Sequence, residues 1–348
     1  MAERRSNVGV RWTQAAALLT TALCLVGLAA GAQADSPGAM IEAGRHAYEV
    51  GKYDKAVEAL KTVVAREPNN SPAHHWLTRT YYEMHNVDAA VAEGERAVAL
   101  EPDNSMYHVW LGLAYGMKAE HAGPFFFGFF LARRTRKEFE EAVQLDPRNF
   151  AAQQDMIEFY CKAPGIVGGG EEKAQRAINA LMPLDEAEAH FARGNCADAK
   201  KRYHEADAEF EAALQARPRR ADVLYDIADS ELNRDRDRVE ILQRTAEMAA
   251  AIDPADLRRE FYRGVVLVMK NVQPGEAERL LNNYIQNAPA GRIGFPPRAS
   301  AQTWLGRAYE QRGNGDAAVA AYRAALASDR KNKAARDALK RLEKAQKQ

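Results

Sequence analysis

Prolines return along this chain at a nearly constant interval. Successive members of the series are separated by 34, 45, 71, 36 and 35 residues, and they are Pro68, Pro102, Pro147, Pro218, Pro254 and Pro289. The interval of 71 corresponds to two periods, and the interval of 45 to one period with about eleven inserted residues. Because alanine is abundant and runs of Val, Ile and Thr are scarce, each period is expected to be a pair of helices. The proline of each period predicts where its second helix has ended.

Large and small residues also recur at fixed offsets within the periods. The clearest copies are Trp110-Leu111-Gly112-x-x-Tyr115 and Trp304-Leu305-Gly306-x-x-Tyr309. The glycine lets the two helices of a hairpin approach, and the large residues fill the space between hairpins. This pattern resembles the tetratricopeptide repeat (TPR). The resemblance implies an all-α fold, a right-handed superhelical solenoid of about eight TPR helical hairpins over residues 39–332, with a C-terminal capping helix over residues 333–348.

The first 34 residues have the pattern of a secretory signal peptide. Arg4, Arg5 and Arg11 precede an uncharged stretch over residues 15–30, and Ala32-Gln33-Ala34 supplies a small-x-small cleavage site. The apolar core of about 16 residues is short for a membrane span. We therefore predict cleavage after Ala34 and a periplasmic or secreted protein, with an uncleaved signal anchor as the alternative.

In TPR arrays the first helices of the hairpins line a concave groove that holds extended peptides or partner helices. The resemblance therefore implies a groove here, with an Arg-x-x-Tyr-Glu pattern that recurs after 34 residues and then an apolar stretch. The predicted partner-binding residues are Arg45, Tyr48, Glu49, His75, Arg79, Tyr82, Glu83, Leu113, Met117, Met156 and Tyr160, with Val109, Phe191, Tyr225 and Phe261 also along the wall. Arginine pairs with carboxylates and tyrosine adds apolar area with a polar tip, so we expect a protein or peptide partner. The alternative is that each arginine pairs with a glutamate of its own or the next helix.

The longest departure from the repeat is a phenylalanine-rich insertion within residues 119–134. Its core at residues 123–131 contains Phe125, Phe126, Phe127, Phe129 and Phe130. This segment is too short to span a membrane and too apolar to be left in water without a reason. We expect it to fold back between the two helices and pack over the groove or the superhelix edge. The alternatives are an apolar anchor for a protein partner and a membrane-surface wedge backed by arginines.

A second departure is the glycine-rich loop over residues 163–170. Its glycine spacing is that of a phosphate-binding loop, but Glu171 and Glu172 follow where Lys and Ser or Thr are required, and no strand precedes it. We expect a wide turn whose glycines adopt positive φ. Together with the insertion, the loop makes residues 105–185 similar to an uncharacterised group of exported bacterial TPR proteins, a resemblance that implies no activity.

Two cysteines, Cys161 and Cys196, remain after removal of the signal peptide. They lie 35 residues apart, which places them at matching positions on neighbouring inner helices. Packed helices lie about 8–10 Å apart, whereas a disulfide needs Cα atoms within about 7 Å. An oxidising compartment favours the bond. We expect two buried thiols, with a disulfide as the alternative.

The sequence offers no catalytic constellation. Its 48 basic and 48 acidic side chains leave no excess of positive charge for nucleic acid. His204-Glu205 begins a zinc-protease motif, but Ala208 stands where the second histidine is required. We predict no enzyme activity, no cofactor and no metal. The predicted function is a non-enzymatic extracytoplasmic scaffold that binds a peptide segment or helix of a partner protein in its concave groove. The alternative is an envelope assembly factor that contacts the membrane surface through the insertion.

Overall fold

The computed structural model describes residues 36–122, 125–234 and 238–345, so the predicted signal peptide lies outside the described residues. Within these ranges the chain forms α-helices α2 to α18, one 3₁₀ turn and no strand. The first helices are α2 (Pro37–Glu49), α3 (Tyr53–Arg66), α4 (Ser71–Glu83), α5 (Val87–Leu100), α6 (Ser105–His121), α7 (Phe125–Leu145), α8 (Phe150–Lys162) and α9 (Glu171–Leu181), with η1 (Gly165–Val167) before α9. The others are α10 (Glu186–Ala199), α11 (Tyr203–Gln215), α12 (Ala221–Asn233), α13 (Val239–Ile252), α14 (Arg258–Met269), α15 (Pro274–Asn287), α16 (Arg298–Gln311), α17 (Gly315–Ser328) and α18 (Lys333–Ala345).

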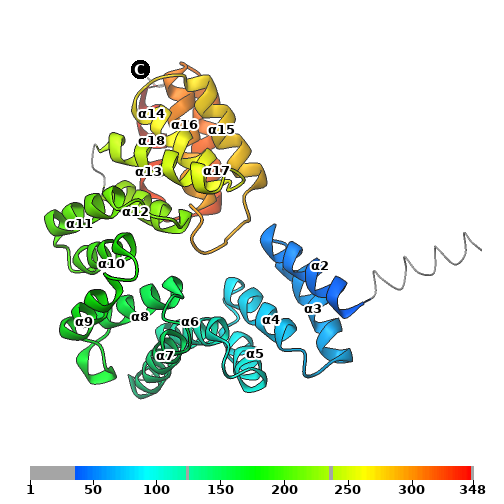
Figure 1. Cartoon of the computed structure of the whole chain (residues 1–348). Helices are drawn as coiled ribbons and strands as arrows, with labels where there is room; N and C mark the ends of the chain where they lie inside the picture. Colours follow the sequence, from blue (N-terminus) through cyan, green and yellow to red (C-terminus); the bar gives the residue numbers. More distant parts are fainter. Residues whose placement is uncertain (1–35, 123–124, 235–237, 346–348) are drawn as a thin grey trace, which may run out of the picture.

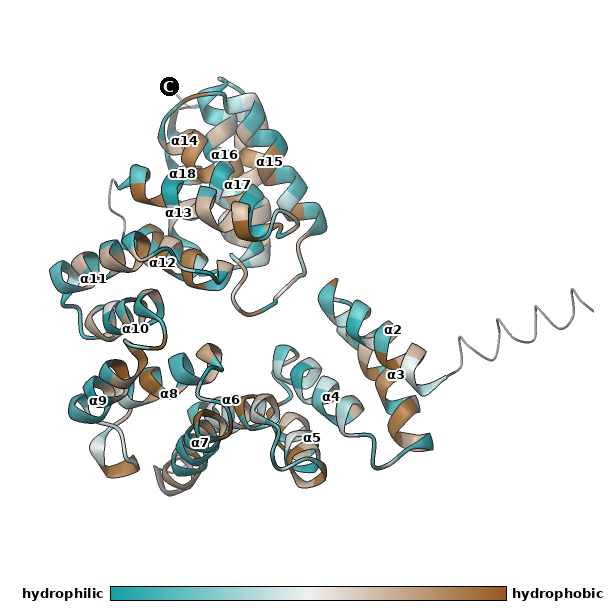
Figure 2. Ribbon diagram, viewed as in Figure 1, coloured by the Kyte–Doolittle hydropathy of each residue, from teal (hydrophilic) through white to brown (hydrophobic). Residues whose placement is uncertain are grey.

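The helices pack in sequence order as eight hairpins, from α2/α3 to α16/α17, and α18 packs against the last of them. Figure 1 shows the array curving around a central space, with α4, α6 and α8 on the inner side and α5, α7 and α9 on the outer side. Hydrophilic residues lie along α7 and α9, on the outside of the curve (Figure 2). The predicted all-α solenoid of TPR-like hairpins is confirmed. Among the described residues, no helix has the length and apolar character needed to cross a bilayer.

Helix boundaries follow the proline series. The second helices α3, α5 and α7 end at Arg66, Leu100 and Leu145, two residues before Pro68, Pro102 and Pro147. Several helices begin at asparagine: the side chain of Asn70 accepts a hydrogen bond from the backbone N–H of Ala73 at 3.0 Å, which caps α4. The period of the sequence is therefore the period of the hairpins.

Glycines in the first helices allow the close packing inside a hairpin. A Cβ atom on Gly112 would lie 2.6 Å from a ring carbon of Phe139, and one on Gly194 would lie 2.5 Å from the ring of Phe210. Each glycine thus faces a large buried ring from the second helix of its own hairpin, and any side chain there would force the helices apart.

The phenylalanine-rich insertion does not fold back as a separate loop. It lengthens the third hairpin, because α6 has 17 residues and α7 has 21, whereas α4 and α5 have 13 and 14. Phe125, Phe126 and Phe127 form the start of α7, and their side chains lie outside the described part of the structure. The rings of Phe129 and Phe130 meet edge to face at 5.6 Å, and Phe130 is 54% exposed. The inserted residues remain helical because Leu131 continues the apolar face and packs against the core of the first repeats.

The glycine-rich loop is a turn whose conformation requires glycine, as expected. Gly168 and Gly170 have φ angles of +98° and +132°, values that L side chains rarely adopt. The backbone N–H of Gly170 donates to the carbonyl of Tyr160 at 2.8 Å, which closes the loop onto the end of α8. Glu171 follows at the start of α9, where the helix dipole favours a negative charge.

Candidate partner-binding groove

The inner side of the curve contains a hollow of about 420 Å³ between α4, α6, α7 and α8. Tyr82 of α4 and Leu113 and Met117 of α6 line it, together with Phe159 of α8. Tyr82 is held in place by Trp110, whose ring it meets edge to face at 5.6 Å. Three of the predicted groove residues are therefore brought together in one apolar depression, which we call the central groove.

Carboxylates border the central groove on α8 and continue onto α12. Burial raises the pKa of Asp155 to about 7, and repulsion from Glu158 adds to the effect. Burial likewise raises the pKa of Asp226 to about 7, with further repulsion from Asp222 and Asp229. Within the described part of the chain neither Asp155 nor Asp226 forms a hydrogen bond or an ion pair.

The side chain of Asp226 is nevertheless exposed to water. Protein encloses this carboxylate on several sides, which raises its pKa, but one side remains open to the concave space. The wall thus presents two unpaired acids to whatever enters the space.

Met156 and Tyr160, which we expected in the groove, do not line the central groove. Each is only 8% exposed, and the hydroxyl of Tyr160 donates to Glu140 of α7 at 2.7 Å. Tyr160 lies 45 residues after Tyr115, the same interval that separates Pro102 from Pro147. This spacing identifies Tyr160 as the equivalent of Tyr115, a buried tyrosine inside the hairpin. The residues of α8 that line the groove instead include Asp155 and Glu158.

Further residues that we expected on the wall lie beneath it. His75 is 7% exposed and stacks on Tyr107 with ring centroids 4.8 Å apart. Burial, aided by the charge of Arg79, lowers the pKa of His75 to about 3, so the imidazole is neutral. Four other expected wall residues are at most 3% exposed because they fill the space between hairpins: Val109, Phe191, Tyr225 and Phe261.

The two Arg-x-x-Tyr-Glu copies have different surroundings. Arg45 pairs with Glu42 and Glu49 of its own helix, each at 2.6 Å, as in the alternative interpretation. Arg79 instead lies among aromatic rings, with its guanidinium 4.3 Å from the centroid of Trp76 and 4.6 Å from that of Trp110. The repeated sequence pattern therefore does not produce two equivalent binding positions.

Tyr48 and Glu83 are brought together but are covered by another part of the chain. The Tyr48 hydroxyl donates to one carboxylate oxygen of Glu83 at 3.0 Å, and the backbone N–H of Ile293 donates to the other at 2.8 Å. Tyr48 is 1% exposed and Glu83 is 6% exposed. Burial raises the pKa of Glu83. Repeat spacing does not predict this contact, because Ile293 lies 210 residues from Glu83 and outside the repeat pattern.

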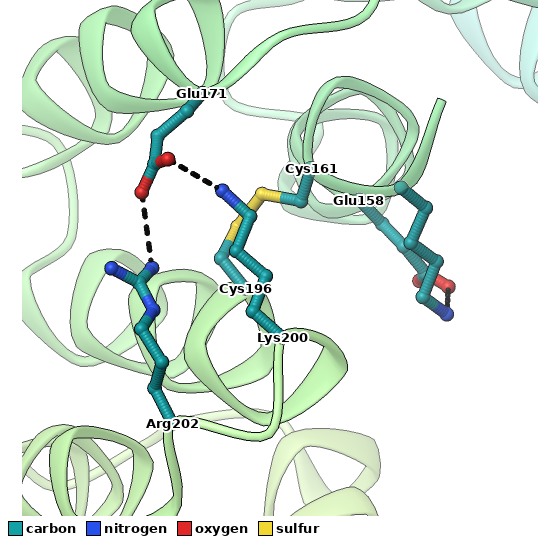
Figure 3. Close-up of a disulfide and its surroundings, with 7 residues drawn as sticks. Glu158, Cys161, Glu171, Cys196, Lys200 and Arg202 are labelled. Atoms are coloured by element: carbon teal, nitrogen blue, oxygen red, sulfur yellow. Dashed lines mark hydrogen bonds and ion pairs between the residues drawn. A yellow bond between two sulfur atoms is a disulfide. The ribbon is translucent and has the colours of Figure 1, made fainter. Parts of the chain in front are cut away.

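Cys161 and Cys196 form a disulfide, so the expectation of two thiols is wrong. Their Cα atoms are 5.5 Å apart. The distance of 8–10 Å on which that expectation rested separates helix axes, and Cα atoms that face each other are closer by about two helix radii of 2.3 Å. The bond joins α8 to α10 beside the concave wall. Next to it, Glu171 pairs with Lys200 at 2.9 Å and with Arg202 at 3.1 Å (Figure 3).

Two buried histidines connect the helices of their own hairpins. His74 contacts Glu93 and the carbonyl of Pro68 through its two ring nitrogens, and His108 contacts Glu138 and the carbonyl of Pro102 in the same way. Among the described residues, no group of three or more His, Cys, Asp or Glu side chains is arranged to hold a metal ion.

The fold is a solenoid of helical hairpins with a concave inner side, and sequence models of a known repeat family match three parts of the chain. Residues 47–109, 187–220 and 267–335 match sequence models of the tetratricopeptide repeat. The chain thus contains tetratricopeptide repeats, which act as protein-interaction scaffolds and are typically non-catalytic. No curated protein matches the chain.

Several solved structures resemble the chain at low identity. A thermophilic TPR protein of Thermus thermophilus is 22% identical, with a TM-score of 0.46 over 57% of this chain and 100% of that one. A TPR protein of Parabacteroides merdae is 12% identical, with a TM-score of 0.39 over 88% and 98%. The O-GlcNAc transferase of Thermobaculum terrenum is 21% identical, with a TM-score of 0.33 over 47% of this chain and 26% of the enzyme. The repeat is identified by the sequence models and the hairpin geometry.

Proposed function

We propose that the protein is an extracytoplasmic scaffold that holds a basic, partly apolar segment of a partner protein in its central groove. The observation that carries this proposal is the adjacency of an apolar hollow and unpaired carboxylates on one concave wall. Leu113 and Met117 belong to the hollow, and Asp155 stands at its edge with Asp226 further along the wall. A peptide segment or helix that carries an apolar side chain near lysine or arginine matches both features.

Electrostatics favours a cationic partner over an acidic one. The charges of Glu158 and Asp226 raise the pKa of Asp155 and Arg220 opposes them only in part, so the carboxylates repel one another in the empty groove. A lysine or arginine placed between them relieves this repulsion and gains a charge-assisted hydrogen bond, whereas an acidic segment adds to the repulsion. The groove thus selects its partner by charge as well as by shape.

The extracytoplasmic location is also a proposal. It is supported by the signal-peptide pattern of residues 1–34, which includes Arg4, Arg5 and the Ala32-Gln33-Ala34 cleavage site. The Cys161–Cys196 bond supports it independently, because disulfides persist mainly in oxidising compartments. Amino-terminal sequencing of the protein recovered from the periplasm tests it: a chain that begins at Asp35 agrees, and one that retains Met1 in the cytoplasm does not.

Fluorescence anisotropy with two labelled peptides of equal length tests the groove. One peptide alternates leucine and lysine, and the other alternates leucine and glutamate. We expect binding of the lysine peptide only, and a several-fold weaker affinity when Asp155 and Asp226 are both changed to Asn. Asp316→Asn, at an exposed position on the last hairpin, is the matched control and leaves the affinity unchanged. Equal binding of both peptides, or no effect of the paired substitution, refutes the proposal.

A second candidate function is contact with a membrane surface through the lengthened third hairpin. Phe130 is 54% exposed near the start of α7, and Arg133 lies over the ring of Phe129 at 5.7 Å. An exposed aromatic ring beside arginines is a combination that suits the boundary between headgroups and acyl chains. This observation concerns only one end of one hairpin, whereas residues of four helices line the central groove. Groove binding is therefore the better supported function.

A further inference from the structure

The segment between α15 and α16, residues 288–297, crosses from the C-terminal hairpins to the first hairpin, and we call it the strap. Figure 1 shows it running from the C-terminal hairpins toward α2. Its base is fixed to the C-terminal part of the array. The hydroxyl of Tyr284 donates to the carbonyl of Pro296 at 2.6 Å. The guanidinium of Arg258 lies 5.0 Å from the ring of Phe295 and 4.3 Å from that of Tyr225.

The tip of the strap is a tight turn. The backbone N–H of Phe295 donates to the carbonyl of Arg292 at 3.1 Å, and Gly294 between them has a φ of +80°. A negative φ at Ile293 followed by a positive φ at Gly294 is the arrangement of a type II turn. The turn presents the guanidinium of Arg292 and the backbone N–H of Ile293 to the first hairpins.

The tip rests on a surface formed by Tyr48, Gly51, Tyr53 and Glu83, which we call the N-terminal cradle. The backbone N–H of Ile293 donates to Glu83 at 2.8 Å, and the Arg292 guanidinium lies 5.3 Å from the Tyr48 ring centroid. Gly51 leaves room for the strap, because a Cβ atom there would come within 3.0 Å of the Cα atom of Pro289. These contacts join repeats at opposite ends of the array and close its curve.

Each group that the cradle recognises is one that a separate peptide can supply. Glu83 receives a backbone N–H, Tyr48 receives a guanidinium, and Gly51 receives a proline. The side chain of Ile293 is 46% exposed, so the tip is attached through few contacts and is not part of the core. Because the strap is tethered, its effective concentration at the cradle is in the millimolar range. A weak contact therefore stays formed, but a free peptide can still compete with it.

We propose that the N-terminal cradle is a second peptide-binding site, occupied by the strap in the resting protein. Its partner is an extended segment that carries an arginine and an aliphatic residue in a glycine turn after a proline, the chemistry of the strap itself. Binding of such a segment displaces the strap tip and frees the first hairpins from the C-terminal hairpins. This site is separate from the central groove, so the inference does not depend on what the groove binds.

The test uses a fluorescein-labelled peptide with the sequence of residues 288–297, added to the chain that begins at residue 35. Ile293→Pro removes the N–H that Glu83 accepts, and proline suits this position of a type II turn, so the strap keeps its shape. Ile293→Ala is the matched control, because it shortens an exposed side chain and keeps the N–H. A hydrogen bond to a charged group changes a binding constant by roughly tenfold or more.

We therefore expect the peptide to bind Ile293→Pro about tenfold more tightly than it binds the wild-type chain or Ile293→Ala. Adding Glu83→Gln to Ile293→Pro removes this gain, and circular dichroism of each variant verifies that the helices are retained. Equal affinity for all three chains, or no binding at millimolar peptide, overturns the proposal. Concentration-dependent dimerisation of Ile293→Pro without peptide binding also overturns it, because the occupant is then the strap of a second copy.

Discussion

The Cys161–Cys196 disulfide makes a quantitative prediction about stability. The bond closes a loop of about 36 residues, because the two cysteines are separated by 35 positions. The loop-entropy relation gives a reduction in unfolded-state entropy of about 13 cal/mol/K for this length, or about 4 kcal/mol at 25 °C. We expect the reduced protein to lose close to this amount of unfolding free energy, since the rest of the interface between α8 and α10 is unchanged.

Urea unfolding followed by circular dichroism at 222 nm measures the effect. With an m-value of roughly 3 kcal/mol/M, the midpoint should fall by about 1 M on reduction. The protein that begins at residue 35 is suited to this assay because it contains no other cysteine. The Cys161→Ala/Cys196→Ala variant should unfold near the midpoint of the reduced protein, with or without reductant, which separates loss of the bond from other effects of the reductant.

Two results refute this reasoning. One is the titration of two free thiols in the native, air-oxidised protein, which shows that the bond is absent. The other is an unchanged midpoint on reduction, which shows that the bond forms but does not restrict the unfolded chain.

Three further predictions concern packing, charge and the membrane. Gly112→Ala should lower the unfolding free energy by about 2 kcal/mol through overpacking. Gly116→Ala should raise it by about 0.5–1 kcal/mol, because the new Cβ atom meets nothing closer than 3.6 Å. Thermal unfolding measures both changes. Affinity for the lysine peptide should rise between pH 6 and pH 8 as Asp155 and Asp226 ionise through pKa values of about 7, and the paired Asn variant should show a flat profile. The raised pKa of Asp155 favours the protonated folded state, so its contribution to stability is present at low pH and is lost as the pH rises through 7. If the protein contacts a membrane surface through the third hairpin, the wild-type chain floats with anionic liposomes and Phe130→Ser does not. A wild-type chain that does not float, or a variant that floats equally well, excludes this function.

The repeat could be predicted from the sequence because it depends on local spacing. The proline interval located the ends of the second helices, and Gly112 and Gly194 marked the faces where two helices of a hairpin meet. Both signals repeat with the period of the structure. Because the same packing repeats from one hairpin to the next, these signals together predict a solenoid.

The composition of the site was harder to predict for three different reasons. Met156 and Tyr160 lie outside the groove because α8 follows an insertion, so the repeat positions of this helix have to be counted across the inserted residues. The third hairpin is longer because the inserted residues continue its helices and Leu131 packs against the core of the first repeats, a contact that periodicity does not reveal. The strap contact of Ile293 with Glu83 spans 210 residues and follows from the total curvature of the array, which no single repeat encodes.

Site-specific photo-crosslinking in living cells tests most directly whether the concave side is the working surface. A benzoylphenylalanine residue is placed at Leu113 in the central groove or at Ile252, which is 41% exposed on an outer helix. We predict a discrete crosslinked species with one partner protein at Leu113, lost in the Asp155→Asn/Asp226→Asn chain, and none at Ile252. A partner captured at Ile252 and not at Leu113 would contradict the account.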